Sequence, residues 1–270
     1  METIVTSDGQ RVNTTPTING GHVETAPTVD GTERRKRRGR VGRFLLGGAL
    51  VLIVAGIVAH LAWKYSGSNQ WKKTAERKGV TLYTMKSPGA AVEKFKAVWK
   101  IHSKLGRFVM WATDAKGDSM RRESGLYDLR VLDRQNARVH RVAWKQPLAS
   151  FLEPRQFVTK NEFSQNPTTK VLLYAVSAIP DAVPPDDCCV RVQVMDNSWT
   201  LTPLKDGEIE VEWYVNMDIG GSIPYFLQNS VQPGGMMRFA PKVESFIEIA
   251  KYKNAQFDWL REAAVTGQQR

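Results

Sequence analysis

The sequence predicts an α+β fold: a long antiparallel sheet closed by a C-terminal helix, with one transmembrane helix before it. An uncharged apolar segment at residues 44–63 is long enough to span a bilayer. Between residues 80 and 217, short segments that alternate apolar and polar side chains are separated by turn-forming residues, as in strands with one buried face. Residues 241–264 repeat apolar side chains at helical spacing, which predicts a helix with one buried face.

The N-terminal residues 1–43 are predicted to form a disordered basic tail. Residues 1–33 are rich in Thr, Gly, Asn, Val and Pro and lack the sustained period of a helix or strand. From Arg34 to Arg43, seven residues are Lys or Arg, a pattern also found in nuclear signals and nucleic-acid-binding arms. Because this block directly precedes an apolar segment, we interpret it as the flank of a membrane span and predict no nucleic-acid partner.

Phe44–Trp63 is predicted to be a transmembrane helix. Its 20 residues contain no Asp, Glu, Lys or Arg, and as a helix they would span about 30 Å, the thickness of a bilayer core. Trp63 and Tyr65 are typical of the membrane interface. A cleaved signal peptide is the alternative, but the leader is roughly forty residues long and no small-x-small cleavage site lies around Ala62.

The charge bias across this span predicts its orientation. Positive residues are dense before residue 44 and sparse after it, where Lys64, Lys72 and Lys73 come first. The positive-inside rule places the N-terminus in the cytoplasm and the C-terminal domain outside, which is the periplasmic side of the inner membrane if the chain is bacterial. The net charge of +11 also favours an anionic partner such as a membrane surface.

Residues 66–264 are predicted to form one domain, followed by a tail at residues 265–270. Turn-forming sequences separate its strands. The predicted helices cover residues 104–112 and 118–123, and the predicted strands cover residues 80–87, 92–101, 126–133, 137–145, 155–162, 171–177, 190–194 continuing through 199–201, and 208–217.

The final helix of this domain is predicted in two parts. Ser222 is expected to cap the first part, and Pro224 is tolerated in a first turn. The sequence PGG at residues 233–235 is expected to end it. The second part is predicted over residues 241–264, with one apolar face that must cover another element.

The cysteines and histidines predict neither a disulfide framework nor a metal site. Cys188 and Cys189 are the only cysteines, and because they are adjacent we expect that they do not bridge to each other. The four histidines lie far apart in the sequence, and none belongs to a Cys/His cluster. No metal or other cofactor is predicted.

The strand over residues 208–217 has one apolar and one polar face. Alternate residues point to opposite sides of a strand. The same alternation is expected at residues 190–194, where three valines oppose Arg191 and Gln193. From the residues alone, a packed core is favoured over a ligand pocket. The apolar set is Val211, Trp213, Val215 and Met217, and the polar set is Glu210, Glu212, Asn216 and Asp218.

Three segments, in this order, resemble the START domains, the steroidogenic-acute-regulatory-related lipid-transfer family. They are HRVAWKQPLASFLEPRQFV (140–158), VPPDDCCVRVQVMDNSWTLTPL (183–204) and EVEWYVNMDIGGSIPYFLQNSV (210–231). The resemblance extends over roughly residues 68–260. It implies a helix-grip fold, in which a curved antiparallel sheet wraps a long C-terminal helix around one internal cavity for a lipid.

The resemblance implies that large residues on the apolar faces of the strands line this cavity and do not simply pack in a solid core. The candidate ligand-binding residues are Trp144, Phe157, Tyr174, Trp199, Trp213, Val215, Met217, Leu227 and Val231.

Two segments are expected to control access to the cavity. Leu148, Phe151 and Leu152 lie in a loop that is expected to be a gate exposed to the membrane, with packing under the helix as the alternative. Gly220 and Gly221 turn the chain from the last strand into the final helix. They lack the basic and hydroxyl neighbours of a phosphate-binding loop, so we interpret them as the hinge of a lid.

The sequence departs from the sterol-binding branch of the family at two positions. That branch places a buried acid and a buried arginine in the cavity. Here Arg155 follows Pro154, but Asn161 stands at the position that corresponds to the buried arginine, and Val142 stands at that of the acid. A cavity without this ion pair avoids its desolvation cost and offers weaker polar contacts, so a sterol ligand is not specified.

The sequence therefore predicts a membrane-anchored lipid-binding or lipid-transfer protein for a sterol-like, hopanoid or phospholipid ligand. Only a few residues separate the span from the first predicted strand, which favours local extraction, handover or sensing over free diffusion. A cyclase-like or hydrolase-like enzyme is one alternative, with His140, Tyr174 and Asp218 as candidate acids or bases. A lipid-sensing module that recruits an anionic partner is another; no protein partner is specified.

Overall fold

The computed structural model describes residues 31–114 and 116–262, which divide into two units between residues 56 and 57. Helix α1 (Gly31–Tyr65) fills the described part of the first unit and enters the second. Phe44–Tyr65 is the one helical segment in the described residues that is long and apolar enough to span a membrane, with a mean hydropathy of 2.5. The predicted apolar helix is thus present. It begins at Gly31, so it includes the basic block, whose Lys and Arg residues are good helix formers; residues 1–30 of the predicted tail lie outside the described residues.

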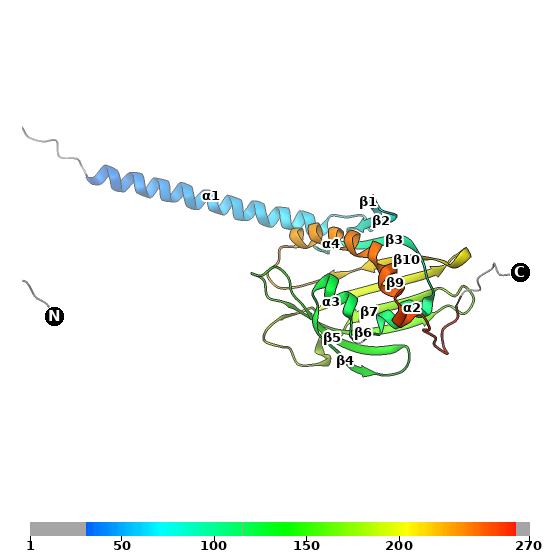
Figure 1. Cartoon of the computed structure of the whole chain (residues 1–270). Helices are drawn as coiled ribbons and strands as arrows, with labels where there is room; N and C mark the ends of the chain where they lie inside the picture. The colour runs from blue at the N-terminus through cyan, green and yellow to red at the C-terminus, as the bar shows by residue number, and fades with distance from the viewer. Residues whose placement is uncertain (1–30, 115, 263–270) are drawn as a thin grey trace, which may run out of the picture. The chain divides into compact units, whose positions relative to one another are not determined.

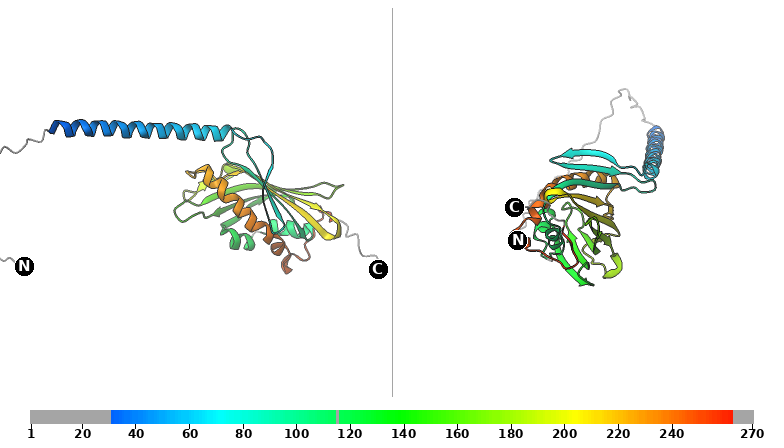
Figure 2. Two further views of the ribbon diagram at one scale, coloured as in Figure 1. Left: turned by 90° about the horizontal axis from the view of Figure 1, so that it is seen from above. Right: turned by 90° about the vertical axis from the view of Figure 1, so that its right-hand side faces the viewer.

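The second unit is built on one large curved sheet (Figures 1 and 2). Its main path runs β1-β2-β3-β10-β9-β7-β6-β5-β4 with antiparallel neighbours, β11 pairs with β9, and β8 pairs in parallel with β6. The strands are β1 (Lys72–Arg77), β2 (Val80–Met85), β3 (Lys94–His102), β4 (Tyr127–Arg134), β5 (Val139–Gln146), β6 (Arg155–Gln165), β7 (Leu172–Ala178), β8 (Val190–Arg191), β9 (Val194–Pro203), β10 (Glu208–Val215) and β11 (Met217–Asp218).

The predicted strands are confirmed, with three differences. Strand β1 was not predicted, because it is an edge strand whose residues KKTAER are almost all exposed and therefore do not alternate. The segment predicted as one strand from residue 190 to residue 201 is divided into β8 and β9, and the strand predicted over residues 208–217 is divided into β10 and β11. All three differences concern short or edge strands, where hydrophobic periodicity is weakest.

Helices cover one face of the sheet (Figure 2). They are α2 (Leu105–Ala112), α3 (Asp118–Ser124), α4 (Tyr225–Phe239) and α5 (Val243–Ile247), with short 3-10 turns at Ala240–Lys242 and Ala250–Tyr252 on either side of α5. Phe108 of α2 and Met236 of α4 are completely buried, together with Val211 of β10. This core between sheet and helices is the helix-grip arrangement that the sequence predicts.

The prediction of a final helix in two parts, a short one ending at residues 233–235 and a long one over residues 241–264, was wrong. Helix α4 continues through Pro233 and both following glycines to Phe239, and Pro224 precedes the helix with no side-chain cap from Ser222. After α5, residues 253–262 are not helical. Instead this segment crosses to the start of α2, where the Glu262 carboxylate accepts hydrogen bonds from the backbone N–H groups of Leu105 (2.9 Å) and Gly106 (2.7 Å). A carboxylate at a helix N-terminus satisfies N–H groups that have no partner within the helix.

Candidate functional site

A pocket of about 620 Å³ lies between the sheet and α4. This volume is within the range of small-molecule sites in proteins, about 300–1,000 Å³. Side chains from α2, strands β4–β7 and β9–β11, and α4 form its wall. A second pocket, lined by residues of β2, β3 and β10, is smaller, at about 500 Å³.

The pocket wall contains most of the side chains that the sequence analysis predicts to bind the ligand. Leu227 is the exception: its side chain points away from the pocket and is 47 % exposed. Helix α4 begins at Tyr225, so the positions that face the pocket follow helical spacing through Gln228, Val231, Gln232 and Gly235 instead. The predicted ligand-binding residues that lie in the wall are Trp144, Phe157, Tyr174, Trp199, Trp213, Val215, Met217 and Val231. Their contact with a ligand stays a prediction.

Aromatic rings form the centre of the wall. Trp199 of β9 stacks on Trp213 of β10 with ring centroids 4.8 Å apart, because the two residues are directly paired in the β9–β10 ladder. Phe108 and Trp111 of α2 contact the same Trp199 ring at 5.6 and 5.9 Å. Trp144 and Phe157 form a second stacked pair at 4.9 Å on β5 and β6. These pairs give a rigid apolar surface.

A buried polar cluster interrupts this apolar wall. Asn161 donates from Nδ2 to the Tyr174 hydroxyl at 2.7 Å and accepts at Oδ1 from the Thr159 hydroxyl at 2.6 Å. His140 stacks on Tyr174, with ring centroids 6.5 Å apart. Burial, with a smaller contribution from the charge of Arg134, lowers the pKa of His140 to about 4, and burial also raises the pKa of Tyr174. The cluster is therefore neutral at physiological pH.

The structure places the two positions that depart from the sterol-binding pattern in the pocket wall. Val142 and Asn161 both line it, on neighbouring strands. Arg155 also lines it and is only 2 % exposed, but among residues 31–114 and 116–262 no acid forms an ion pair with it. Its guanidinium donates to the backbone carbonyls of Glu153 (2.5 Å), Ile219 (2.7 Å) and Gly220 (2.9 Å). Burial lowers the pKa of Arg155, and these carbonyls compensate part of that cost.

The predicted hinge glycines have the backbone conformation that favours glycine. Gly220 has a φ of 65° and Gly221 a φ of 72°. Asp218 accepts from the Gly220 N–H at 2.9 Å, and Arg155 binds the Gly220 carbonyl. This turn is held in place by polar contacts on both sides, while its movement as a hinge stays a prediction. Asp218, one of the candidate catalytic acids, is exposed and lies outside the pocket wall.

The three residues of the predicted gate loop differ in their surroundings. Leu148 lines the pocket, Leu152 is half-buried, and Phe151 is 83 % exposed. The loop thus joins the pocket wall to the protein surface. Contact with a membrane stays a prediction.

Residues 126–250 match the family model of the START domain. These residues, slightly less than half of the chain, form a START domain. The solved structure of a STAR-related lipid transfer protein from Xanthomonas axonopodis is 18 % identical in sequence, with a TM-score of 0.60 over 66 % of this chain and 99 % of that one. Human StAR-related lipid transfer protein 5 is 16 % identical, with a TM-score of 0.57 over 75 % of this chain and 97 % of that one.

A curated relative of this chain comes from a bacterium. An uncharacterized protein of Pseudomonas aeruginosa is 24 % identical over 168 residues, which are 60 % of this chain and 79 % of the relative. The START family and these structural neighbours together support a lipid-binding role. The resemblance read from the sequence motifs, and the fold that it implies, are confirmed.

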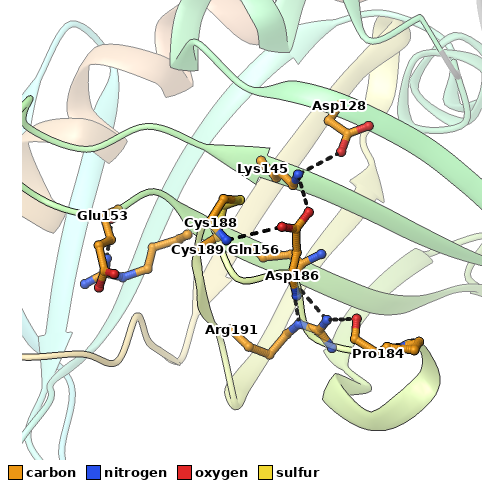
Figure 3. The surroundings of a disulfide bond; sticks show 10 residues. Asp128, Lys145, Glu153, Gln156, Pro184, Asp186, Cys188, Cys189 and Arg191 are labelled. Atoms are coloured by element: carbon orange, nitrogen blue, oxygen red, sulfur yellow. Dashed lines mark hydrogen bonds and ion pairs between the residues drawn. A yellow bond between two sulfur atoms is a disulfide. The ribbon is translucent and has the colours of Figure 1, made fainter.

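The expectation that the adjacent cysteines of the START domain do not bridge was wrong. Cys188 and Cys189 form a disulfide, with their Cα atoms 3.7 Å apart (Figure 3). They lie in a tight turn in which the Cys189 N–H donates to the Asp186 carbonyl at 3.2 Å. This Cα separation is close to the roughly 3.8 Å of a trans peptide unit. The disulfide therefore forms in this turn without bringing the two Cα atoms closer together than in other trans-linked residues.

The polar face that the alternation predicts at residues 190–194 was also wrong for Arg191. Its guanidinium is buried and donates to Gln156 Oε1 at 2.9 and 3.1 Å and to the Pro184 carbonyl at 2.7 Å (Figure 3). Because β8 ends at Arg191, the alternation does not continue, and Val194 at the start of β9 is 51 % exposed. Lys145 holds the same loop through Asp186 at 2.5 Å.

Several residues of the START pocket were missed by the sequence interpretation. Gln228 and Asn197 are buried polar side chains in its wall, and Trp111, Met236 and Phe239 are buried apolar ones. Helical spacing from Val231 identifies Gln228 once the start of α4 is known. Asn197 carries no such signal, because its role is local: its Oδ1 accepts from the Asn216 N–H at 3.0 Å.

Proposed function

We propose that this chain is a membrane-anchored START protein that holds one hydrophobic lipid molecule in the pocket beneath α4. The observation that carries the proposal is the pocket itself, about 620 Å³ with a predominantly aromatic and aliphatic wall. Removing a lipid body from water releases roughly 25 cal/mol per Å² of apolar area, which is ample for stable binding. The family match and the lipid-transfer neighbours support the same role.

The anchor is the apolar part of α1, with the basic block on its cytoplasmic side and the START domain outside. Within the second unit, the end of α1 is attached to the domain: Trp63 stacks on Tyr225, the first residue of α4, at 5.8 Å, and its Nε1 donates to the Ala91 carbonyl at 2.8 Å. An anchored domain works at one membrane. We therefore infer local extraction, handover or sensing of the lipid.

A catalytic role remains the alternative hypothesis. Of the three candidate acids or bases, His140 and Tyr174 line the pocket and Asp218 does not. A neutral imidazole with a pKa of about 4 is a weak base at physiological pH. The proposal therefore includes binding and no catalytic step.

A matched pair of variants on β10 tests the proposal. Trp213→Arg places a charged side chain in the pocket, whereas Tyr214→Arg places the same side chain on the opposite face of the same strand. The full chain is purified in detergent and its retained lipid is measured by mass spectrometry. We expect about one retained lipid per chain to be lost in Trp213→Arg and kept in Tyr214→Arg. Equal amounts of lipid in all three proteins would contradict the proposal.

A further inference from the structure

Three polar side chains of the pocket wall come together on neighbouring strands. His140 lies on β5, Asn161 on β6 and Tyr174 on β7, and each is at most 6 % exposed. His140 and Asn161 are directly paired in the β5–β6 ladder, so their side chains emerge on the same face. All three line the pocket.

The hydrogen bonds inside this cluster have a fixed direction. The Thr159 hydroxyl donates to Asn161 Oδ1, which leaves the Asn161 amide nitrogen facing Tyr174. That nitrogen donates to the Tyr174 oxygen. Because the phenol oxygen accepts this bond, its own hydrogen is directed elsewhere.

The cluster has hydrogen-bonding capacity that its own contacts do not use. No acceptor for the Tyr174 hydroxyl hydrogen is found among residues 31–114 and 116–262, and the same holds for the second N–H of Asn161. Within those residues neither ring nitrogen of His140 has a hydrogen-bond partner, and the neutral ring offers one donor and one acceptor. Buried polar groups are almost always paired, so this set of donors points to a ligand atom that accepts.

We propose that His140, Asn161 and Tyr174 bind a neutral oxygen, a hydroxyl or a carbonyl, of the lipid in the pocket. The proposal rests on the proposed lipid-binding function and names the ligand class within it: a lipid alcohol or ketone. A hydroxyl fits because it accepts from Tyr174 or Asn161 and donates to His140. A carbonyl fits because its two lone pairs accept from two of these donors.

The charges around the cluster favour a neutral group over an anionic one. Arg155 lies six residues earlier on β6, about 20 Å along the strand, and its guanidinium already binds backbone carbonyls. Arg134, opposite His140 in the β4–β5 ladder, is exposed and donates to the Thr113 carbonyl at 3.3 Å. A carboxylate or phosphate buried beside the cluster would lack a buried cationic partner, which is strongly unfavourable.

The test compares probes that differ only in their head group. Each carries pyrene on a dodecyl chain that ends in a methyl, a hydroxyl or a carboxylate group. Binding to the full chain in nanodiscs is followed by energy transfer from tryptophan to pyrene, and the Trp213→Arg chain measures partitioning into the bilayer alone. We expect the hydroxyl probe to bind roughly tenfold more tightly than the methyl probe, and the carboxylate probe no more tightly than the methyl probe.

Variants of the cluster identify where the head group binds. Asn161→Leu and Tyr174→Phe should lower the affinity for the hydroxyl probe to that for the methyl probe, while affinity for the methyl probe is kept. Tyr214→Phe, which removes one hydroxyl group outside the pocket wall, should keep the tenfold preference. If Asn161→Leu fails to fold by circular dichroism, Tyr174→Phe decides, because it removes only one hydroxyl group.

The outcomes separate this inference from the function on which it rests. If none of the probes binds beyond the partitioning of the Trp213→Arg chain, the proposed function fails. If all three bind equally, or if the preference survives in Tyr174→Phe, the inference is wrong and lipid binding stands. Tightest binding of the carboxylate probe would overturn the assignment of a neutral ligand group.

Discussion

The turn before α4 allows one contact to be tested almost in isolation. Gly220 and Gly221 both have positive φ, so alanine at either position meets the same backbone strain. A Cβ on Gly220 would lie 3.6 Å from the nearest atom, a methyl group of Val190, which is an ordinary contact. A Cβ on Gly221 would lie 2.9 Å from Nη2 of Arg155, which is too close. The two substitutions therefore differ mainly in what they do to Arg155.

The expected magnitudes follow from these contacts. Placing alanine in the left-handed region costs roughly 1 kcal/mol, and we expect Gly220→Ala to lower the free energy of unfolding by that amount. In Gly221→Ala the guanidinium must also move. It is 2 % exposed and bound to three backbone carbonyls, and losing one bond of a charged donor costs about 2 kcal/mol. The total for Gly221→Ala is about 3 kcal/mol.

Urea unfolding of the full chain in detergent, followed by circular dichroism, measures the difference. A second comparison in an Arg155→Ala background isolates the contact, since there both glycine substitutions should cost the same. If Gly220→Ala and Gly221→Ala destabilise the original chain within about 0.5 kcal/mol of each other, Arg155 moves freely and does not hold this turn.

Three further predictions concern stability. Burial holds the pKa of His140 at about 4 in the folded chain, so as the pH falls from 6.5 to about 4 this histidine is protonated in the unfolded chain but not in the folded one. The free energy of unfolding should therefore drop by about 3 kcal/mol between these two pH values. Urea titrations should show this drop flattened in His140→Gln and unchanged in a variant of the exposed His102. Cys188→Ser should cost only about 1 kcal/mol in urea titrations, because its bond closes a loop of two adjacent residues; a loss as large as that of a long-loop disulfide would contradict this. Phe108→Ala should cost about 3–5 kcal/mol in the same measurement, and Phe226→Ala, 60 % exposed, less than about 0.5; similar losses would show that Phe108 is not in a rigid core.

The strands were predictable where one face is buried, because alternation with a period of two then appears directly in the sequence. On β10, Val211 and Val215 are buried and Glu210 is exposed, as the pattern indicates. Strand β1 escaped prediction because both its faces are open to solvent. The pattern thus reports burial, and it identifies a strand only when the strand has an interior side.

Contacts between distant segments explain most of the errors. Arg191 follows the strand alternation in sequence, but its place is decided by Gln156 and by carbonyls of the preceding loop. The C-terminal residues have helical spacing, but Glu262 reaches the start of α2. Pro233 and its glycines have low helix propensity, yet α4 continues through them where its neighbours are packed on the core. At Pro233 and its glycines, tertiary packing outweighs a local preference of about 1–3 kcal/mol.

The two halves of α4 are attached to the domain by different kinds of contact, which indicates where the pocket opens. Beyond the stacking of Tyr225 on Trp63, the first half is held by polar contacts: Asn229 accepts from the Glu93 N–H at 3.0 Å, and Gln228 donates to the Met217 carbonyl at 2.5 Å. The second half buries Met236 and Phe239 in the core. Exposing two such side chains costs about 1.5–3 kcal/mol each, whereas hydrogen bonds that water can replace contribute about 0.5–1.5 kcal/mol each. We therefore expect α4 to lift from its first turn, beside the two hinge glycines, while its second half stays packed as the pivot.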